Sequence, residues 1–523
     1  MQILEKTELD FSDVLIKPRR STLSSRADVD INRKYKFKWT SSVAYGTGIM
    51  QSNMGTIGTF DVSRKMLKGG LFACLHKHHD IQDLIDFYKS LDPDTEWNRC
   101  FISIGLKDNG LEKVRKLKEM VFVNEEYDPS ICIDVPNGYI PQVKELVIKV
   151  RKEFPHSIIM VGNVVTGDIV EDLILSGADI VKVGIGNGSN CIVSDTQVIT
   201  KNGIIKIQDI KEGDEVLTHT GEYHKVLTKL CYTHHHEKMM VNGIECTPEH
   251  KFLITKCKTE DGIIPKDKIK YWTEWIEACN IDVYTDYLVK IHDGVYTYED
   301  IHICGMEKND QKVYDLEVEK DHSFVVGDGI IVHNCLTRRQ TGVGRPQFST
   351  IVECADAAHQ VGGMVCADGG ITCPGDIGKA FGAGADFIMI GGLYAGTDEA
   401  DGEIIEKTYL TTERNTEHNT CGFKSHDKVY ETKKFKMFYG MSSTLAQEKF
   451  GNGKPKYRAS EGRVTLVPYV GSVDDVNEEF LGGLRSTMTY IGAAKLKDIP
   501  KCCVFYKVNN QLNRMYENTT IGK

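Results

Sequence analysis

Two stretches of this chain carry residue types that could cradle an anion and attack an electrophile. Gly184-Ile-Gly-Asn-Gly-Ser-Asn190 has the glycine spacing of a loop that closes a βα unit, where backbone N–H groups can approach an anion closely. Cys335-Leu-Thr-Arg-Arg-Gln-Thr-Gly-Val-Gly344 has the residues expected to follow that loop, and its cysteine would be a nucleophile as the thiolate. Residues 191–334 separate the two stretches. The sequence therefore predicts one functional loop that is interrupted by an insert.

On both sides of the insert, short apolar runs that end in glycine or polar residues alternate with amphipathic stretches. This pattern predicts strands at 131–135, 158–161, 180–183, 364–367 and 387–390, and helices at 168–176, 351–359 and 375–381. Without the insert about 380 residues remain, a size that suits a (β/α)8 TIM barrel. We therefore expect a single α/β domain in two pieces, 1–190 and 335–523.

The insert has a different residue pattern from the rest of the chain. Residues 191–334 are short, alternating segments rich in Thr and Val, such as 196–200, which is followed by the turn pair Asn202-Gly203. This pattern predicts an all-β domain.

Composition limits the classes of function. No apolar run approaches the roughly 18 residues that a membrane span needs, and the first ten residues mix charges where a secretory signal would be apolar. We therefore expect a soluble, cytoplasmic protein without a membrane partner. The 16 scattered cysteines favour free thiols. The net charge of -10 comes without a basic stripe, so nucleic-acid binding is not indicated.

Read across the gap, Gly186-Asn-Gly-Ser189 and Cys335-Leu-Thr-Arg338 resemble the catalytic loop of the IMP dehydrogenase / GMP reductase family. The likeness extends over nearly all of the chain outside the insert. It is reinforced by Gly162-Asn-Val-Val165, Ala367-Asp-Gly-Gly370, Phe438-Tyr-Gly-Met-Ser442 and Tyr457-Arg-Ala-Ser-Glu-Gly462.

Phe438-Tyr-Gly-Met-Ser-Ser443 and Ala459-Ser-Glu-Gly462 look like the reductase members, and no segment resembles the regulatory domains of most dehydrogenases. The resemblance implies NADPH-dependent reductive deamination of GMP to IMP and ammonia. NAD-dependent oxidation of IMP is the alternative.

The resemblance also implies roles for individual residues. Cys335 would attack carbon 2 of the purine, while Thr337 and Glu461 would transfer protons. Taken without the family, Cys335 would read as a buried structural cysteine and Glu461 as a solvated surface acid. By the same likeness the carbonyls of Gly186, Gly188 and Cys335 would hold a potassium ion, and the protein would be a homotetramer.

Matched positions also imply the ligand contacts. The nucleotide would be held by Asp368, Gly369, Gly370, Gly391, Gly392, Gly440, Met441, Ser442, Arg458, Ser460 and Gly462, with Asp368 accepting from the ribose hydroxyls. The cofactor would be held by Ser25, Arg26, Lys77, Asp134, Tyr457, Arg458, Ser486 and Thr487, with Ser25 and Arg26 at its 2'-phosphate. Without the family, a Gly-Gly pair after a strand is more often only a tight turn.

Some positions depart from the family pattern. Pro136 stands where the family usually has Ala, Gly55 where it has Asp, and Leu336 where it has Thr. None of these changes removes a catalytic group, but Gly55 leaves one acid missing near the site. Residues 411–434 are longer than expected for a reductase, and we interpret them as an elaborated active-site loop.

The insert resembles an intein of the Hint fold. Its blocks are Cys191-Ile-Val-Ser-Asp-Thr196, Cys246-Thr-Pro-Glu-His250, Val313-Tyr-Asp-Leu-Glu-Val318 with His322, and Val332-His-Asn334 before Cys335. About 60 residues lie between the second and third blocks, without paired acidic endonuclease motifs, so a splicing-only form is expected.

Each intein residue type has a step in splicing. Cys191 would take over the upstream acyl group in an N-to-S shift, assisted by Thr247 and His250, while Asp315 would assist the thiol steps. Cys335 would accept the acyl group, and Asn334 would then cyclise with His322 and His333 as proton donors.

Two alternatives concern the insert. His234-His-His-Glu237 has zinc-ligand residue types, but adjacent residues on a strand cannot all face one ion, so we favour an exposed hairpin. A chain that no longer splices would instead persist as a binding or structural module.

Overall fold

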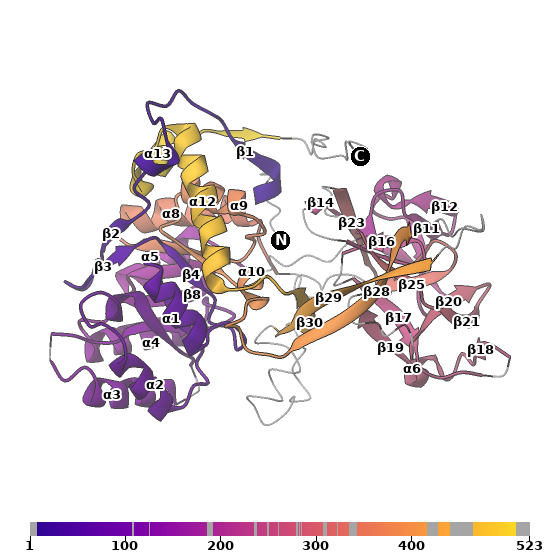
Figure 1. Cartoon of the computed structure of the whole chain (residues 1–523), viewed down its shortest axis with the longest axis horizontal. Helices are drawn as coiled ribbons and strands as arrows, with labels where there is room; N and C mark the ends of the chain where they lie inside the picture. The colour runs from indigo at the N-terminus through magenta and orange to yellow at the C-terminus, as the bar shows by residue number, and fades with distance from the viewer. Residues whose placement is uncertain are drawn as a thin grey trace, which may run out of the picture. The chain divides into compact units, whose positions relative to one another are not determined.

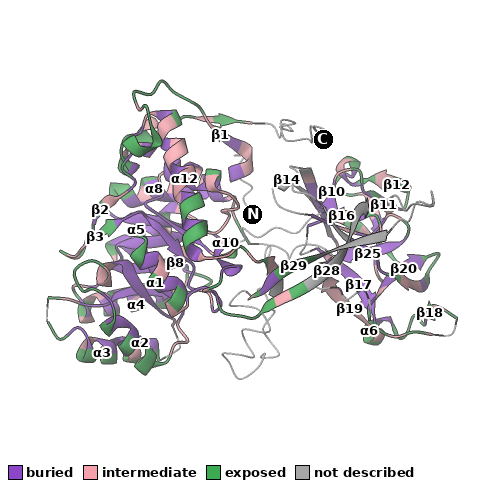
Figure 2. Cartoon of the chain, viewed as in Figure 1, coloured by how far each residue is buried: buried purple, intermediate pink, exposed green. Residues whose placement is uncertain are grey.

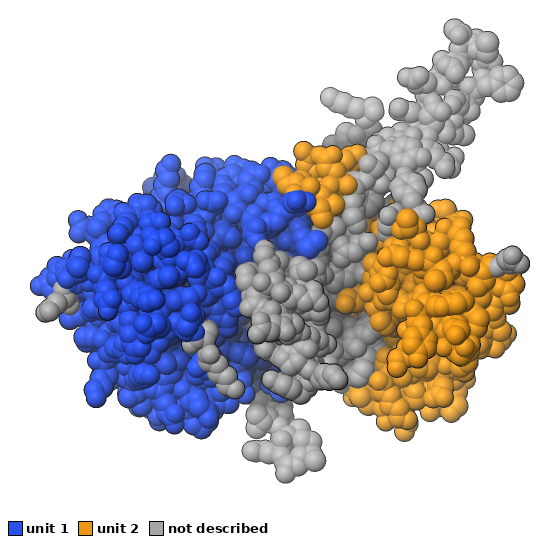
Figure 3. Space-filling view, turned by 90° about the horizontal axis from the view of Figure 1, so that it is seen from below, with its two compact units in different colours: residues 1–187, 342–403, 436–509 blue, residues 188–341, 404–435, 510–523 orange. Residues whose placement is uncertain are grey.

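The computed structural model describes residues 8–106, 109–124, 126–185, 192–234, 238–247, 250–259, 261–278, 281, 283, 285–306, 311–321, 323–333, 343–415, 427–439 and 464–508. The chain divides into two compact units (Figure 3). Unit 1 comprises residues 1–187, 342–403 and 436–509, and unit 2 comprises residues 188–341, 404–435 and 510–523.

Eight parallel strands form the centre of unit 1 (Figure 1). They are β4 (Ile49–Gln51), β5 (Ala73–Leu75), β6 (Cys100–Ile104), β7 (Ser130–Asp134), β8 (Ile159–Val164), β9 (Ile180–Val183), β26 (Met364–Asp368) and β27 (Phe387–Ile390). Their hydrogen-bonded order is β4-β27-β26-β9-β8-β7-β6-β5. A parallel bridge between Met50 and Phe72 joins the two outer strands, so the barrel is nearly closed. The predicted (β/α)8 barrel is confirmed.

Helices alternate with these strands along the chain. They are α1 (Phe60–Lys68), α2 (Ile81–Lys89), α3 (Gly110–Met120), α4 (Pro141–Glu153), α5 (Gly167–Leu175), α8 (Gln347–Gln360), α9 (Pro374–Gly382) and α12 (Val473–Ile491). Side-chain caps begin α1 at Thr59, α2 at Asp80 and α12 at Ser472. Figure 2 shows mostly buried strands and exposed residues on the helices, as expected for strands covered on both faces.

The predicted element boundaries hold to within a few residues. Strands β9 and β27 are identical to their predictions, and α5 begins and ends one residue early. Helix α8 begins at Gln347, four residues before the predicted start, because no N-cap residue marks that start in the sequence.

The interruption lies between β9 and α8, and unit 1 holds its two flanks together. The backbone N–H of Arg345 donates to the carbonyl of Ile185 at 3.3 Å. The Arg345 guanidinium donates to the carbonyl of Val165 at 2.8 Å, and Gln347 Nε2 donates to that of Val183 at 2.9 Å. Residues before and after the insert therefore belong to one barrel.

Residues 192–333 contribute a large antiparallel sheet. Its strands are β10 (Ile192–Val193), β11 (Gln197–Thr200), β12 (Gly203–Lys206), β13 (Glu215–Leu217), β14 (Tyr223–His234), β15 (Lys238–Val241), β16 (Ile244–Cys246), β17 (Lys251–Thr255), β18 (Ile263–Ile264), β19 (Thr273–Glu277), β20 (Tyr287–His292), β21 (Val295–Asp300), β22 (Ile303–Met306), β23 (Gln311–Val318), β24 (Ser323–Val326) and β25 (Ile330–His333). The sequence pattern predicts strands in this segment, and the structure contains them. The Hint assignment and the insert boundaries stay predictions.

Smaller elements complete the description. They are the paired strands β1 (Val14–Ile16) and β31 (Phe505–Lys507), the paired strands β2 (Arg33–Lys36) and β3 (Val43–Gly46), and the short helices α6 (Ile269–Trp272), α10 (Gly392–Ala395), α13 (Ile499–Cys502), η1 (Phe11–Asp13), η2 (Arg26–Asp28), η3 (Trp97–Arg99), η4 (Ile207–Asp209) and η6 (Leu496–Asp498).

A three-stranded sheet has the order β28 (Ile404–Asn415), β29 (Asp427–Tyr439) and β30 (Val464–Pro468). The predicted loop at 411–434 is thus strand wherever it is described, because β28 and β29 are hydrogen-bonded neighbours in this sheet. Its active-site role stays a prediction. Across the described ranges, no helix is both long and apolar enough to span a bilayer.

Candidate functional site

Two carboxylates and one ammonium meet near the carboxyl ends of the barrel strands. Asp134 ends β7, Asp368 ends β26, and Lys182 lies in β9 between them. Lys182 Nζ is 2.7 Å from Asp134 Oδ1 and 3.3 Å from Asp368 Oδ2. The lysine side chain is 2% exposed, whereas the two acids are 24% and 22% exposed. The acids are therefore accessible while their shared cation is buried.

Strand register accounts for this arrangement. Asp134 pairs with Gly162 of β8, and Gly162 pairs in turn with Lys182. A Cβ on Gly162 would come within 2.6 Å of the Lys182 Cβ and 2.5 Å of its carbonyl oxygen. Glycine at this position therefore leaves room for the ion pair across β8.

Two amides hold Asp368 in place. Asn163 Nδ2 donates to Asp368 Oδ2 and to the carbonyl of Gly184, both at 2.9 Å. Gln347 Nε2 donates to the Asp368 carbonyl at 3.2 Å. These bonds tie the acid to β8 and to the start of α8, so its orientation does not depend on its own strand alone.

The charges of the cluster stabilise one another. Burial opposes ionisation of Asp134, but the Lys182 ammonium, with help from Lys77 and a hydrogen bond from Asn53, holds the pKa of this carboxyl below its usual value. Burial would also lower the pKa of Lys182, yet Asp134 and Asp368 raise it well above the usual value. The buried ammonium therefore stays charged at neutral pH.

The predicted phosphate-binding glycines follow the last two barrel strands. Gly369 and Gly370 come directly after β26 with φ of 88° and 82°, a conformation that side chains disfavour. Gly391 follows β27 and precedes α10, and a Cβ there would lie 3.4 Å from Met54 Sδ. Gly391 and Gly392 thus stand at the same end of the barrel as Asp368, where TIM-barrel sites lie.

The other predicted cofactor residues lie on separate elements. Ser25 caps η2, with Oγ accepting from the Ala27 N–H at 3.2 Å, and Arg26 is exposed. On α12, the hydroxyls of Ser486 and Thr487 donate to carbonyls of Gly482 and Gly483. No hydrogen bond or ion pair between described residues joins these four to the Asp134–Lys182–Asp368 cluster.

Several predicted site residues lie outside the described ranges, so their placement stays a prediction. They are Cys191, His322, Asn334, Cys335, Thr337, Glu461, Gly186, Gly188, Gly440, Met441, Ser442, Tyr457, Arg458, Ser460 and Gly462. Residues 235–237 also lie outside the described ranges, so the exposed hairpin favoured over a zinc site at 234–237 stays a prediction.

Sequence reasoning missed Lys182, Asn163 and Gln347. A signal for Lys182 was present, because a single charged residue in the apolar run Ile180-Val-Lys-Val183 of a buried parallel strand needs a partner.

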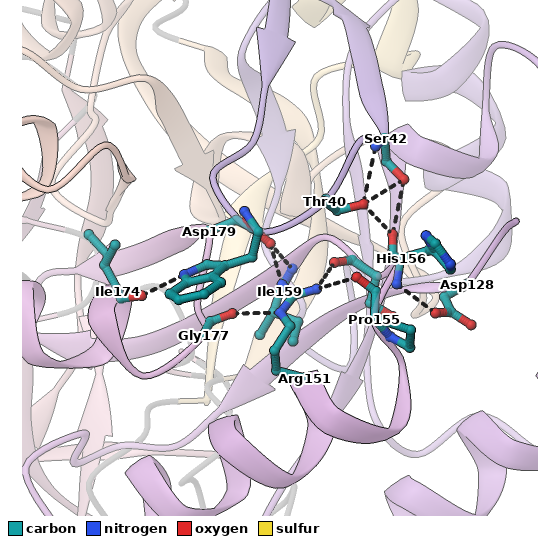
Figure 4. Close-up of polar contacts among 12 residues, drawn as sticks. Thr40, Ser42, Asp128, Arg151, Pro155, His156, Ile159, Ile174, Gly177 and Asp179 are labelled. Atoms are coloured by element: carbon teal, nitrogen blue, oxygen red, sulfur yellow. Dashed lines mark hydrogen bonds and ion pairs between the residues drawn. The ribbon is translucent and has the colours of Figure 1, made fainter.

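The opposite end of the barrel carries a separate polar network (Figure 4). Arg151 of α4 donates to Asp179 Oδ2 at 2.6 Å and to the carbonyls of Gly177, Pro155 and Ser157. Asp179, which precedes β9, also accepts from the N–H of Ile159 at 3.0 Å. Such a network at the amino ends of strands is a stabilising feature.

In unit 2, the strands next to the two predicted splice junctions pair with β16 and β17, which follow each other in the sequence. Ile192, which follows Cys191 in sequence, pairs with Cys246 and with Tyr314. Those two residues precede the predicted Thr247 and Asp315. At the other end, His333 pairs with Lys251, the residue after His250. The first strand of 192–333, β10, therefore pairs with β16, which precedes Thr247, and the last, β25, pairs with β17, which follows His250.

Three residues to which the resemblance assigns splicing roles are buried. Thr247 and His250 are fully buried and Asp315 is 1% exposed. Asp315 Oδ1 accepts from the Leu316 N–H at 2.9 Å. Neither ring nitrogen of His250 has a hydrogen-bond partner among the described residues, and burial lowers the pKa of His250 to about 3. The imidazole is therefore neutral at ordinary pH.

A family model matches both sides of the antiparallel segment and also extends into the segment from each side. A model of the IMP dehydrogenase / GMP reductase domain matches residues 8–227, 322–416 and 420–515, and the unmatched residues 228–321 lie within 191–334. The chain is 32% identical to the GMP reductase of Vibrio atlanticus (strain LGP32) over 516 residues, or 99% of both chains.

Two further relatives show the same extent of similarity. Identity to the GMP reductase of Caenorhabditis elegans is 33% over 515 residues, which cover 98% of this chain and 96% of that one. Identity to GMP reductase 2 of Mus musculus is 32% over 513 residues, or 98% and 97% of the two chains.

Proposed function

We propose that this chain, which belongs to the IMP dehydrogenase / GMP reductase family, is an oxidoreductase that acts as a GMP reductase. The observation that carries the proposal is the near full-length similarity to relatives named GMP reductase. It is supported by acids and glycines at the carboxyl ends of β7, β26 and β27.

In the proposed reaction, the Cys335 thiolate forms a bond to carbon 2 of GMP, and the exocyclic amine leaves as ammonia. Thr337 and Glu461 supply and remove the protons that this exchange requires. NADPH would supply the hydride that reduces carbon 2, after which the C–S bond breaks and IMP leaves with the thiolate restored. The sum is GMP, NADPH and one proton giving IMP, ammonia and NADP+.

The described residues suit the binding part of this reaction. Asp368 is held by Asn163 Nδ2 and Lys182 Nζ on its Oδ2, which leaves Oδ1 to accept from ribose hydroxyls. Gly369, Gly370, Gly391 and Gly392 would present backbone N–H groups to the phosphate.

The same reasoning extends to the cofactor, the ion and the assembly. The exposed guanidinium of Arg26 suits a 2'-phosphate, which favours NADPH over NADH. The potassium site on Gly186, Gly188 and Cys335, the homotetramer and the cytoplasmic location are further parts of the proposal.

The activity is tested by following NADPH absorbance with GMP, and separately NADH formation with IMP and NAD. We expect NADPH consumption that depends on GMP and is abolished by Cys335→Ser. NADH formation from IMP and NAD without NADPH consumption would instead identify an IMP dehydrogenase.

We further propose that residues 191–334 are an intein that removes itself. The observation that carries this proposal is the convergence of Ile192 and His333 on the loop 247–250. An N-to-S shift at Cys191 forms a thioester, and Cys335 then takes the acyl group. Cyclisation of Asn334 releases the insert, and an S-to-N shift joins Asn190 to Cys335.

Mass spectrometry of the expressed chain tests splicing. We expect a host product of about 42 kDa in place of the 58.7 kDa precursor, and a loss of that product in Cys191→Ala. A wild-type sample that contains only the precursor would contradict splicing and favour the non-splicing binding or structural module.

A further inference from the structure

We propose that Lys182 is a positioning residue that couples the nucleotide subsite to the cofactor subsite, because its one buried ammonium holds an acid from each. This inference rests on the proposed function and on the roles that the family resemblance implies, with Asp368 at the ribose and Asp134 at the cofactor.

The geometry makes Lys182 the shared element between the acids. Its Nζ lies 2.7 Å from Asp134 Oδ1 and 3.3 Å from Asp368 Oδ2. The acids belong to β7 and β26, which are separated in the sheet by β8 and β9. A displacement of the ammonium toward one carboxylate therefore weakens its contact with the other.

The surroundings leave the ammonium little freedom to respond in other ways. Lys182 is 2% exposed, so its charge is stabilised by the two carboxylates rather than by bulk water. Gly162 packs against the Lys182 backbone and Cβ. One cation faces two carboxylates, and Lys77 adds a second positive charge that acts on Asp134. Lys182 is thus the cation that both acids contact, while Lys77 acts on Asp134.

The prediction is reciprocal coupling without direct contact. Asp134→Asn removes the charge on the cofactor side and should let Lys182 shift toward Asp368, which alters the acid that receives the ribose. GMP affinity without cofactor should therefore fall about fivefold or more. By the same linkage, Asp368→Asn should weaken NADPH binding in the absence of GMP.

A double-mutant cycle in the expressed protein separates coupling from general damage. Calorimetric GMP affinity is measured for wild type, Asp134→Asn, Lys182→Met and the double variant. We expect Asp134→Asn to have no further effect in the Lys182→Met background. If Lys182→Met does not fold, the reciprocal Asp134→Asn and Asp368→Asn measurements decide by themselves.

Arg151→Met is the matched control, because it also removes a cation from a buried ion pair, at the opposite end of the same barrel. It should lower thermal stability and leave the effect of Asp134→Asn on GMP affinity unchanged.

The coupling would be overturned if Asp134→Asn kept a GMP affinity within twofold of wild type, or if the effects in the cycle were additive. Either result would leave the proposed GMP reductase function standing. Absence of any GMP binding by the unchanged protein would overturn the proposed function and this inference together.

Discussion

At the scale of single residues, Lys182 and His250 show two outcomes for a buried base. Lys182 is surrounded by two carboxylates and stays charged, because their attraction outweighs the loss of hydration. His250 has no charged or hydrogen-bonding partner among the described residues, so burial keeps it neutral. A neutral ring retains one nitrogen that can accept a proton and one that can donate, which suits the amide chemistry proposed at Asn190-Cys191.

We predict that His250 titrates far below an ordinary histidine. In a Cys191→Ala, Asn334→Ala chain with labelled histidines, its ring should protonate at a pKa of about 3, measured by NMR. Above about pH 6.5 the ring is neutral in both states. As pH falls below that value the unfolded chain takes the proton first, so unit 2 loses stability towards the folded pKa. The urea-unfolded chain is the control, and a folded midpoint near 6.5 would contradict the prediction.

At the scale of elements, α8 is fixed to the barrel at both ends. Its amino end is held by Gln347 and its carboxyl end by His359, whose Nε2 lies 2.8 Å from Asp386 Oδ2. Asp386 precedes β27 and also accepts from Arg33 of β2 at 2.8 Å. These contacts fix the helix that follows the interrupted loop independently of the insert.

The contact at His359 predicts a pH-dependent stability. The hydrogen bond to Asp386 raises the pKa of His359 despite its partial burial. A raised pKa means that the protonated form is favoured in the fold. The contribution is thus complete below about pH 6.5 and is lost as pH rises through the folded pKa.

His359→Gln should therefore lower the urea midpoint more at about pH 5.5 than at about pH 8. The loss of unfolding free energy should differ between the two pH values by on the order of 0.5 kcal/mol, because the His359 side chain is 46% exposed and solvent screens the pair. Tyr490→Gln, a change at an exposed position on α12, serves as the control. An equal loss at both pH values would show that the pair does not titrate.

At the scale of the whole molecule, unit 1 contains a nearly closed barrel although residues 191–334, the proposed intein, lie between its two halves in the sequence. The bond between Arg345 and Ile185 and the contacts of Gln347 hold the flanks of the interruption together. The proposed insertion point lies between β9 and α8, and β9 pairs with β26 in the barrel. If residues 191–334 splice out as proposed, we expect the barrel to fold before splicing and the catalytic loop to become continuous only after it.

We predict that Asn334→Ala retains the folded barrel and loses most reductase activity. Hydrogen exchange should show the amides of β7, β8, β9 and β26 as protected as in the spliced enzyme, while NADPH consumption with GMP stays low. Full activity from an uncleaved Asn334→Ala chain would refute the latency of the precursor. Unprotected barrel strands would instead refute folding before splicing.

The sequence by itself predicted five of the eight barrel strands and the helices α5, α8 and α9. The position of the interruption stays a prediction. Hydrophobic period, glycines and turn residues act over a few neighbouring positions, so 180–183 and 387–390 were predicted correctly from local pattern alone. The family resemblance likewise implied roles for Asp134 at the cofactor and Asp368 at the ribose separately, and both roles stay predictions.

Only the tertiary structure decided which of these residues share a partner. Lys182 meets Asp134 and Asp368 through register between strands that lie far apart in the chain. In the same way, antiparallel pairing brings Ile192 and His333 to the loop 247–250. Such neighbours depend on sheet closure and register, which are set by packing of the entire core and leave no local pattern in the sequence.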